Sequence, residues 1–228
     1  MRIDHQKKEP AIHPSAWIAS TALINGDVII EEEVYISYGS VIIAEGAPIH
    51  IKRGTIVMEN VVIKSSEGKT FSNALIIEED VLIGPHAYLI GCTVEKNCFL
   101  AAGAKVYNQA HIGAQSIIEI NGVVHIDTYL KPQTRVPTQH TAFGNPAKIY
   151  PPDDTGKIAK ETESLNLLNL LFQLTDNSKD LKYIAALENY RHILFKHKND
   201  DIMKNFSSKL TDTWQWEKGF KVGKSVGG

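Results

Sequence analysis

The sequence is poor in the features that mark secreted, membrane-spanning and nucleic-acid-binding proteins. It has two cysteines, Cys92 and Cys98, in 228 residues, too few for a framework of disulfides. The formal net charge of −2 provides no positive field for nucleic acid or an anionic membrane. No apolar run approaches the ~20 residues of a membrane-spanning helix, and residues 1–8 show no apolar signal segment. These absences favour a cytoplasmic protein with reduced thiols.

The sequence does contain a six-residue repeat of large aliphatic side chains. Isoleucine recurs at every sixth position from Ile12 to Ile42, and the repeat continues to Val136 with changes of phase. A period of six fits neither an α-helix nor a simple alternating strand. The members are Ile12, Ile18, Ile24, Ile30, Ile36, Ile42, Ile51, Val57, Ile63, Ile77, Ile83, Leu89, Val94, Leu100, Val106, Ile112, Ile118, Val124, Leu130 and Val136.

A second repeating position supports the same period. Four residues after each aliphatic the side chain is small or β-branched, as at Ala22, Val34 and Ala104. Three hexads then make one triangular turn, with the aliphatic side chain pointing inward on each face and the small one near a corner. Turns that stack at the ~4.8 Å strand spacing give about seven coils. We predict an all-β domain over residues 11–150, a left-handed parallel β-helix whose repeat covers 11–140.

Two segments interrupt the repeat. Residues 43–50 exceed one hexad, and residues 65–73 form a polar stretch that must leave the coil. Insertions in a repeat coil emerge on one side and often line a binding site. The sequence fits a binding-site loop and a tolerated surface loop equally well.

The pattern changes after residue 152, where apolar side chains take helical spacing. Two helices are expected, over 156–174 and 180–197, with a turn at 175–179. The second carries Leu187, Tyr190 and Leu194 on one face. We therefore predict a second region, 153–228, in which a helical hairpin and tail pack on or cap the β-helix. A partner-docking role for the helices is the alternative.

Three stretches within 11–152 resemble the hexapeptide-repeat superfamily, most closely its gamma-class carbonic anhydrase-like branch. Residues 48–51 (Pro-Ile-His-Ile) with 54–55 (Gly-Thr) resemble that branch's segment entering the active-site turn. Residues 83–93 resemble its Gly-His…His-Gly-Cys-Thr segment, including a five-residue step. Residues 144–148 (Gly-Asn-Pro-Ala-Lys) match a closing motif shared with the acyltransferases. The resemblance implies a homotrimer of parallel β-helices.

The resemblance also implies a zinc ion bound by three histidines from two subunits. Matched residue by residue, those histidines fall on Lys64, Pro85 and Ile90. Proline and isoleucine have no side-chain donor, and lysine is protonated near neutral pH. We therefore expect no zinc at these positions and no carbonic anhydrase activity. The family's arginine and glutamine fall on Ile43 and Met58.

An acyltransferase is the first functional hypothesis, because related enzymes bind acyl-coenzyme A between two prisms. The acyl group would pass to a small hydroxyl or amine acceptor, with His86 as general base and Glu59 and Lys64 beside it. Cations near the last coils could neutralise the phosphates of the acyl-CoA co-substrate. The candidates are Lys131, Arg135 and Lys148.

Two other hypotheses remain open on the sequence. The first is a catalytically degenerate carbonic anhydrase-like protein that acts as a scaffold or binding module, as the blank metal positions suggest. The second is a metal-independent reaction that uses Glu45, Glu59, Lys64 and His86 on an anionic small molecule. A salt bridge that fills the space left by the metal is the alternative to this last site.

Overall fold

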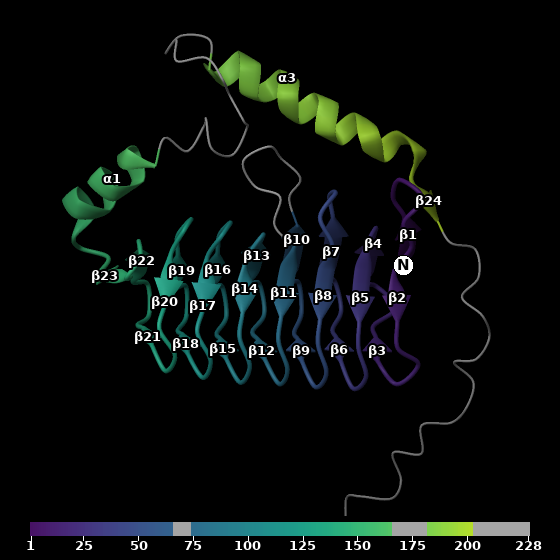
Figure 1. Ribbon diagram of the computed structural model, residues 1–228, viewed down its shortest axis with the longest axis horizontal. Helices are drawn as coiled ribbons and strands as arrows, with labels where there is room; N and C mark the ends of the chain where they lie inside the picture. The colour runs from purple at the N-terminus through teal and green to yellow at the C-terminus, as the bar shows by residue number, and fades with distance from the viewer. Residues whose placement is uncertain (66–73, 166–181, 203–228) are drawn as a thin grey trace, which may run out of the picture.

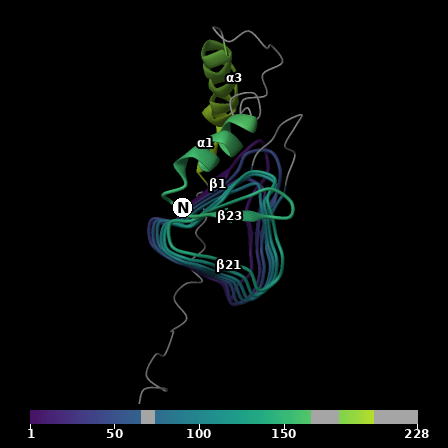
Figure 2. The same cartoon turned by 90° about the vertical axis from the view of Figure 1, so that its left-hand side faces the viewer.

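The computed structural model describes residues 1–65, 74–165 and 182–202, and their main body is a parallel β-helix of three sheets. Figure 2 shows the coil end-on as a triangle, and Figure 1 shows its turns side by side. We call the ten-stranded sheet sheet I, and the two seven-stranded sheets sheet II and sheet III. The predicted parallel β-helix is therefore confirmed.

The strands are short, and each turn of the coil contributes one strand to each sheet. Sheet I contains β1 (Arg2–Asp4), β4 (Leu23–Asn25), β7 (Val41–Ala44), β10 (Val62–Ser65), β13 (Tyr88–Ile90), β16 (Lys105–Val106), β19 (Val123–Val124), β22 (Thr141–Phe143), β23 (Lys148–Tyr150) and β24 (Asp201–Ile202). Sheet II contains β2 (Ala11–Ile12), β5 (Val28–Ile30), β8 (Ile49–Ile51), β11 (Leu75–Ile77), β14 (Thr93–Val94), β17 (His111–Ile112) and β20 (Tyr129–Leu130). Sheet III contains β3 (Trp17–Ile18), β6 (Tyr35–Ile36), β9 (Ile56–Val57), β12 (Leu82–Ile83), β15 (Phe99–Leu100), β18 (Ile117–Ile118) and β21 (Arg135–Val136).

The aliphatic repeat forms the core. From Ile24 to Val136 every member of the series is buried, and members of successive turns pair directly, as Ile18 does with Ile36. The interruptions lengthen single turns, so that Ile51 pairs with Ile77. Residues 66–73, where the expected polar loop falls, lie outside the described residues. Each fully buried aliphatic side chain contributes on the order of 1.5–3 kcal/mol through removal of its surface from water.

The two ends of the prism are closed by antiparallel strands. At one end β22 pairs with β23, and at the other β24 pairs with β1. The coil therefore starts before residue 11, because β1 extends sheet I by pairing with β4. Residues 1–10 lack the six-residue period, which is why the sequence pattern did not reveal this strand. Such pairing covers strand edges that would otherwise attract other chains.

The helical region follows β23 after a short link. It contains α1 (Thr155–Ser164), α3 (Lys182–Phe195) and the 3₁₀ turn η1 (Lys196–Asn199). Residues 166–181, where the expected helical turn falls, lie outside the described residues. In Figures 1 and 2, α3 stands beside the early turns of the coil and α1 near β23. Within the described residues, no helix is long and apolar enough to span a membrane.

The apolar stripe of α3 is only partly covered by its own chain. Of its side chains with described exposure, Ala186 alone is buried, whereas Leu187, Tyr190 and Leu194 are 38%, 38% and 48% exposed. The expectation that this stripe packs on or caps the β-helix stays a prediction.

Candidate functional site

Lys64 lies on sheet I near the corner that leads to sheet II. It occupies β10 between Ile43 and Ile90, its neighbours on the adjacent turns. Its Nζ forms an ion pair of 2.8 Å with Oε1 of Glu45, and both side chains are more than four-fifths buried. Burial opposes the charge of Lys64, but the hydrogen bond and the negative charge of Glu45 outweigh it, and the pKa of Lys64 is raised. Lys64 is therefore a fixed cation.

Pro85 and His86 lie at a different corner, between β12 of sheet III and β13 of sheet I. His86 is exposed and has a left-handed backbone conformation, with φ of +60°. Its backbone N–H donates to the carbonyl oxygen of Glu59 on the preceding turn, at 3.0 Å. The structure thus brings the backbones of His86 and Glu59 together, whereas Lys64 follows Glu59 by five residues, beyond the corner at Asn60 and towards the far end of β10.

The three candidate cofactor cations do not share a face. Lys131 follows β20 of sheet II, Arg135 lies in β21 of sheet III, and Lys148 lies in β23 of sheet I. All three side chains are exposed, and Arg135 is ion-paired with Glu119. The structure therefore places these residues near the same end of the prism without gathering them around one phosphate position.

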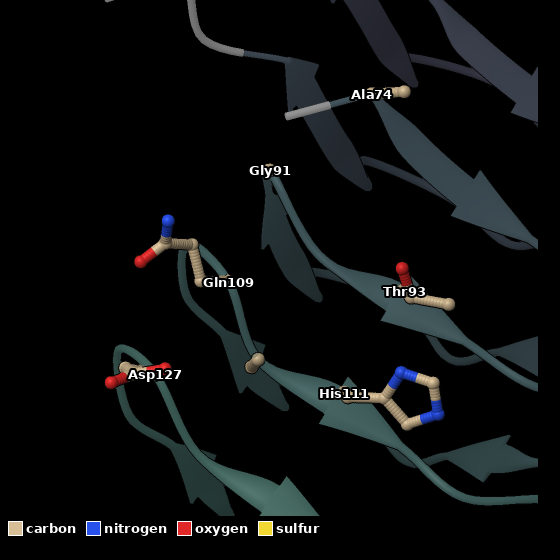
Figure 3. Close-up of a pocket in the computed structure, with 7 residues that line it drawn as sticks. Ala74, Gly91, Thr93, Gln109, His111 and Asp127 are labelled. Atoms are coloured by element: carbon tan, nitrogen blue, oxygen red, sulfur yellow. The ribbon is translucent and has the colours of Figure 1, made fainter. Parts of the chain in front are cut away.

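An open pocket of about 400 Å³ lies on the corner between sheets I and II, on the turns of the coil that follow Lys64. Figure 3 shows Gln109 and Asp127 on successive turns at the corner, and His111 on sheet II. The backbone links the pocket to Lys64, because the N–H of Gly91 donates to the carbonyl oxygen of Lys64 at 2.9 Å. The full lining is Ala74, Gly91, Thr93, Gln109, Ala110, His111 and Asp127.

The pocket carries one titratable pair. Nε2 of His111 lies 2.7 Å from Oε1 of Glu95, and the backbone N–H of Ala114 donates to the other carboxylate oxygen at 2.7 Å. The hydrogen bonds from His111 and Ala114 lower the pKa of Glu95. The carboxylate therefore holds the imidazole at the pocket wall, and the lining offers hydrogen-bonding groups to a small polar molecule.

Comparison with known proteins identifies the family, although no family model matches the chain. Over 145 residues the chain is 32% identical to a carbonic anhydrase of Geobacillus kaustophilus (strain HTA426), covering 64% of this chain and 74% of that protein. It is 27% identical over 183 residues to mitochondrial gamma carbonic anhydrase 2 of Arabidopsis thaliana, covering 78% of this chain. The chain belongs to the gamma carbonic anhydrase-like family. It spans 64% of the length of the Arabidopsis relative.

Comparison with solved structures finds a partial likeness to a hexapeptide transferase. A hexapeptide transferase family protein from Anaplasma phagocytophilum is 21% identical to the chain, with a TM-score of 0.45. The match covers 85% of this chain and 95% of that one. At this TM-score the likeness carries no argument.

The residues at the matched zinc positions of this gamma carbonic anhydrase-like chain do not fit the metal. Lys64 is a cation held by Glu45, and Pro85 and Ile90 offer no side-chain donor. A catalytic zinc needs three nitrogen, sulfur or oxygen ligands and an open position for water. No reaction step through zinc can be derived from these three side chains.

Sequence reasoning missed the pocket and did not single out its His111 among the histidines of separate turns. The signal was present in the spacing, because residues 18 apart stack on successive turns. Gln109 and Asp127 form one such column, and Thr93 and His111 form another, in which they are direct strand partners. Reading every outward position at this period would have placed these side chains together.

Proposed function

We propose that this gamma carbonic anhydrase-like chain is a scaffold or binding module that does not hydrate carbon dioxide at the family's zinc positions. The observation that carries the proposal is the ion pair between Lys64 and Glu45, with Ile43 and Ile90 on either side of Lys64 in the sheet. A fixed cation at this corner repels a divalent metal. The acid beside it is already engaged and stabilises the corner in place of a metal.

The polar pocket next to Lys64 supports a binding role. Its groups are hydrogen-bond donors and acceptors, and the pair of His111 with Glu95 fixes one wall. A small polar or anionic molecule fits this chemistry.

Restoring the three histidines tests the match between this chain and its relatives. The variant Lys64→His, Pro85→His, Ile90→His should bind one zinc per chain more than the wild type in the assembled protein, and should gain zinc-dependent hydration of carbon dioxide. Inductively coupled plasma mass spectrometry of both proteins after equilibration with zinc gives the difference in metal content. Equal zinc content in the two proteins would show that these three positions do not form a zinc site in this chain.

Acyl transfer is the second candidate, favoured by the exposed position of His86 beside the backbone of Glu59. An exposed imidazole can accept a proton from an acceptor hydroxyl or amine if acyl-CoA lies in an adjacent groove. Acetyl-coenzyme A should then raise the unfolding midpoint. At a hundredfold excess over its Kd it should add about 2.7 kcal/mol to the free energy of unfolding. His86→Ala should abolish turnover but retain the shift. No shift would remove this candidate.

The assembly and location that we propose follow the family and the composition. A homotrimer is supported by the apolar side chains that α3 leaves exposed, which a neighbouring copy would cover. We also propose a β-helix domain over residues 11–150, which β1 extends towards the N-terminus, and a helical region over 153–228. A cytoplasmic location is supported by the two free, buried cysteines.

A further inference from the structure

The two ends of the described chain meet on sheet I. Strand β24 pairs antiparallel with β1, so that Ile202 lies opposite Ile3 and Asp201 opposite Asp4. The next residues along each strand are His5 and Asp200, which this register places beside each other. Asp200 follows η1, and η1 contributes a second imidazole, His197, three residues earlier. A cluster of side chains from both ends therefore arises from the strand pairing.

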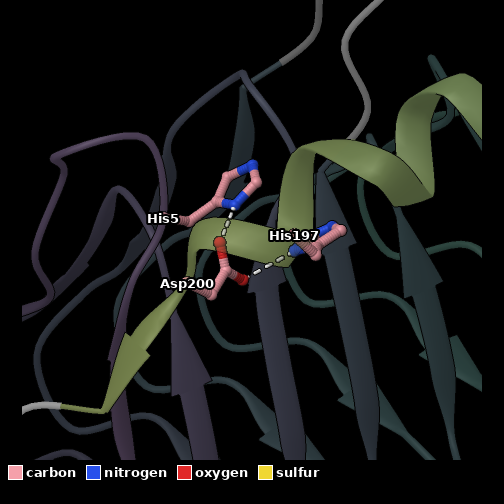
Figure 4. A group of neighbouring side chains, drawn as sticks. All are labelled: His5, His197 and Asp200. Atoms are coloured by element: carbon pink, nitrogen blue, oxygen red, sulfur yellow. Dashed lines mark hydrogen bonds and ion pairs between the residues drawn. The ribbon is translucent and has the colours of Figure 1, made fainter.

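The cluster converges on one carboxylate, as Figure 4 shows. Nδ1 of His5 lies 2.6 Å from Oδ1 of Asp200, and Nδ1 of His197 lies 2.7 Å from Oδ2. The two rings stack with their centroids 4.2 Å apart. One donor atom from each of the three residues lies within 4.8 Å of the other two. Two imidazole nitrogens and one carboxylate oxygen are a typical ligand set for a first-row divalent metal.

The cluster is shielded from water. The side chains of His5, Asp200 and His197 are 4%, 12% and 23% exposed. Shielding strengthens a metal–ligand interaction, and the partial opening at His197 leaves a route for the ion to enter. The cluster thus differs from exposed acidic groups that share a patch of surface.

Each ring has one polar side chain near its other nitrogen. Nε2 of His197 lies 3.8 Å from Oε1 of Glu45, which Lys64 holds at 2.8 Å. Nε2 of His5 lies 3.2 Å from Nε2 of Gln6. Metal-binding histidines usually donate their other ring N–H to a carboxylate or amide, which fixes the ring and its tautomer. Glu45 is the acid nearest to Nε2 of His197 and would accept from it after a shift of a few tenths of an ångström. The amide nitrogen of Gln6 donates to Nε2 of His5 in the metal-free form, and rotation of that amide would present its oxygen to the Nε2–H of the metal-bound form.

Asn25 supplies an independent observation that points to a ligand. Its Nδ2 donates to Oδ2 of Asp200 at 2.9 Å, but its Oδ1 is buried without a hydrogen-bond partner in the described structure. An unsatisfied buried acceptor costs about 1–3 kcal/mol. A cation at the cluster would attract this oxygen, which lies on the same amide that already contacts Asp200.

We propose that His5, His197 and Asp200 bind a divalent transition-metal ion of the zinc class, which ties residues 197–202 to the start of the chain. In the metal-free form a carboxylate oxygen accepts, so each ring donates its Nδ1–H to Asp200. On binding, the proton moves to Nε2 of the same ring and the Nδ1 lone pair faces the metal. This site is separate from the matched zinc positions at Lys64, Pro85 and Ile90, and its role is structural.

The test is zinc binding by the full chain without a polyhistidine tag, after removal of metal with a chelator. Isothermal titration should give one zinc per chain, and zinc should raise the unfolding midpoint. His197→Ala should lower the affinity at least ~10-fold, and Glu45→Gln should lower it by about 10–100-fold as a second-layer change. His13→Ala, an exposed histidine outside the cluster, should bind as the wild type does.

Two further measurements keep the proposal falsifiable if His197→Ala folds poorly. Cobalt(II) bound to the wild type should show the visible absorption of a four-coordinate site, and zinc should slow hydrogen exchange of the amides in β1 and β24. Absence of a zinc-dependent midpoint shift in the wild type would overturn the proposal. Equal affinity in His197→Ala and His13→Ala would overturn it as well.

Discussion

His125 shows how a single residue of the coil responds to its neighbours. Its ring stacks on Phe143 with centroids 4.5 Å apart and lies 5.5 Å from the ring of Tyr107. The backbone N–H of Ile126 donates to its Nδ1 at 2.9 Å, so this nitrogen is an acceptor in the neutral ring. Burial disfavours the charged form and lowers the pKa of His125 below 6.5. The imidazole acts here as a stacked aromatic ring.

This lowered pKa predicts a pH dependence of stability. As the pH falls through 6.5 the unfolded chain binds a proton at His125 before the folded chain does, so this residue's contribution is present above 6.5 and is lost on acidification. Replacing it by phenylalanine should remove that component. Urea unfolding at pH 7.5 and 5.5 should show a smaller loss of stability for His125→Phe than for the wild type. An equal loss would contradict the assignment, and His13→Phe serves as the exposed control.

At the scale of the element, the corners set the geometry of each turn. Many corner residues adopt positive φ, among them Asn60 at +56° and Gly39 at +70°. The side-chain oxygen of Asn60 occupies the space where a Cβ at Gly39 would lie. Asparagine tolerates the left-handed conformation, and glycine leaves room for the side chain of the turn stacked on it.

The corner at Gly39 predicts a contrast between two glycines. Gly39→Ala should destabilise the protein by about 1–2 kcal/mol, because alanine is strained at positive φ and meets Asn60. Gly156→Ala in α1 should change stability by less than ~0.5 kcal/mol or stabilise slightly, since nothing lies within 4 Å of the position that the new Cβ would take. Guanidinium unfolding of the two variants measures the contrast. Equal effects would show that the corners do not constrain the coil.

The elements also show what the sequence could predict. The inward aliphatic positions follow a strict period, so their burial from Ile24 to Val136 was predictable. The pairing of β24 with β1 was not, because Asp201 and Ile202 carry no periodic signal and their partners lie at the other end of the chain. For the same reason no local pattern joined His5 to Asp200. The ion pair of Lys64 with Glu45 was predictable as an alternative, because Glu45 directly follows β7 and Lys64 lies in β10 on the next turn of the same sheet.

At the scale of the whole molecule, the exposed apolar side chains of α3 predict association. Ile184, Leu187 and Leu194 are 53%, 38% and 48% exposed, and a second copy that covers them would bury a continuous stripe. Light scattering coupled to size exclusion should give three chains per particle. Leu194→Asp should shift the protein towards the monomer.

A variant on another face distinguishes a specific contact through α3 from nonspecific hydrophobic association. Phe99 is 41% exposed on the outer face of sheet III, where it is the strand partner of Leu82 on the preceding turn. Phe99→Asp should leave the trimer intact if α3 makes the subunit contact. Loss of the trimer in Phe99→Asp with retention in Leu194→Asp would move the contact to sheet III.

The central claim is that this gamma carbonic anhydrase-like chain does not perform zinc-dependent hydration at the corner held by Lys64 and Glu45. The most direct measurement is the stopped-flow rate of carbon dioxide hydration by the wild-type protein, purified without a tag and equilibrated with zinc. We expect a rate equal to that of buffer with zinc alone, even if one zinc is bound at His5, His197 and Asp200. Hydration that rises in proportion to protein concentration and is abolished by a chelator would contradict the account.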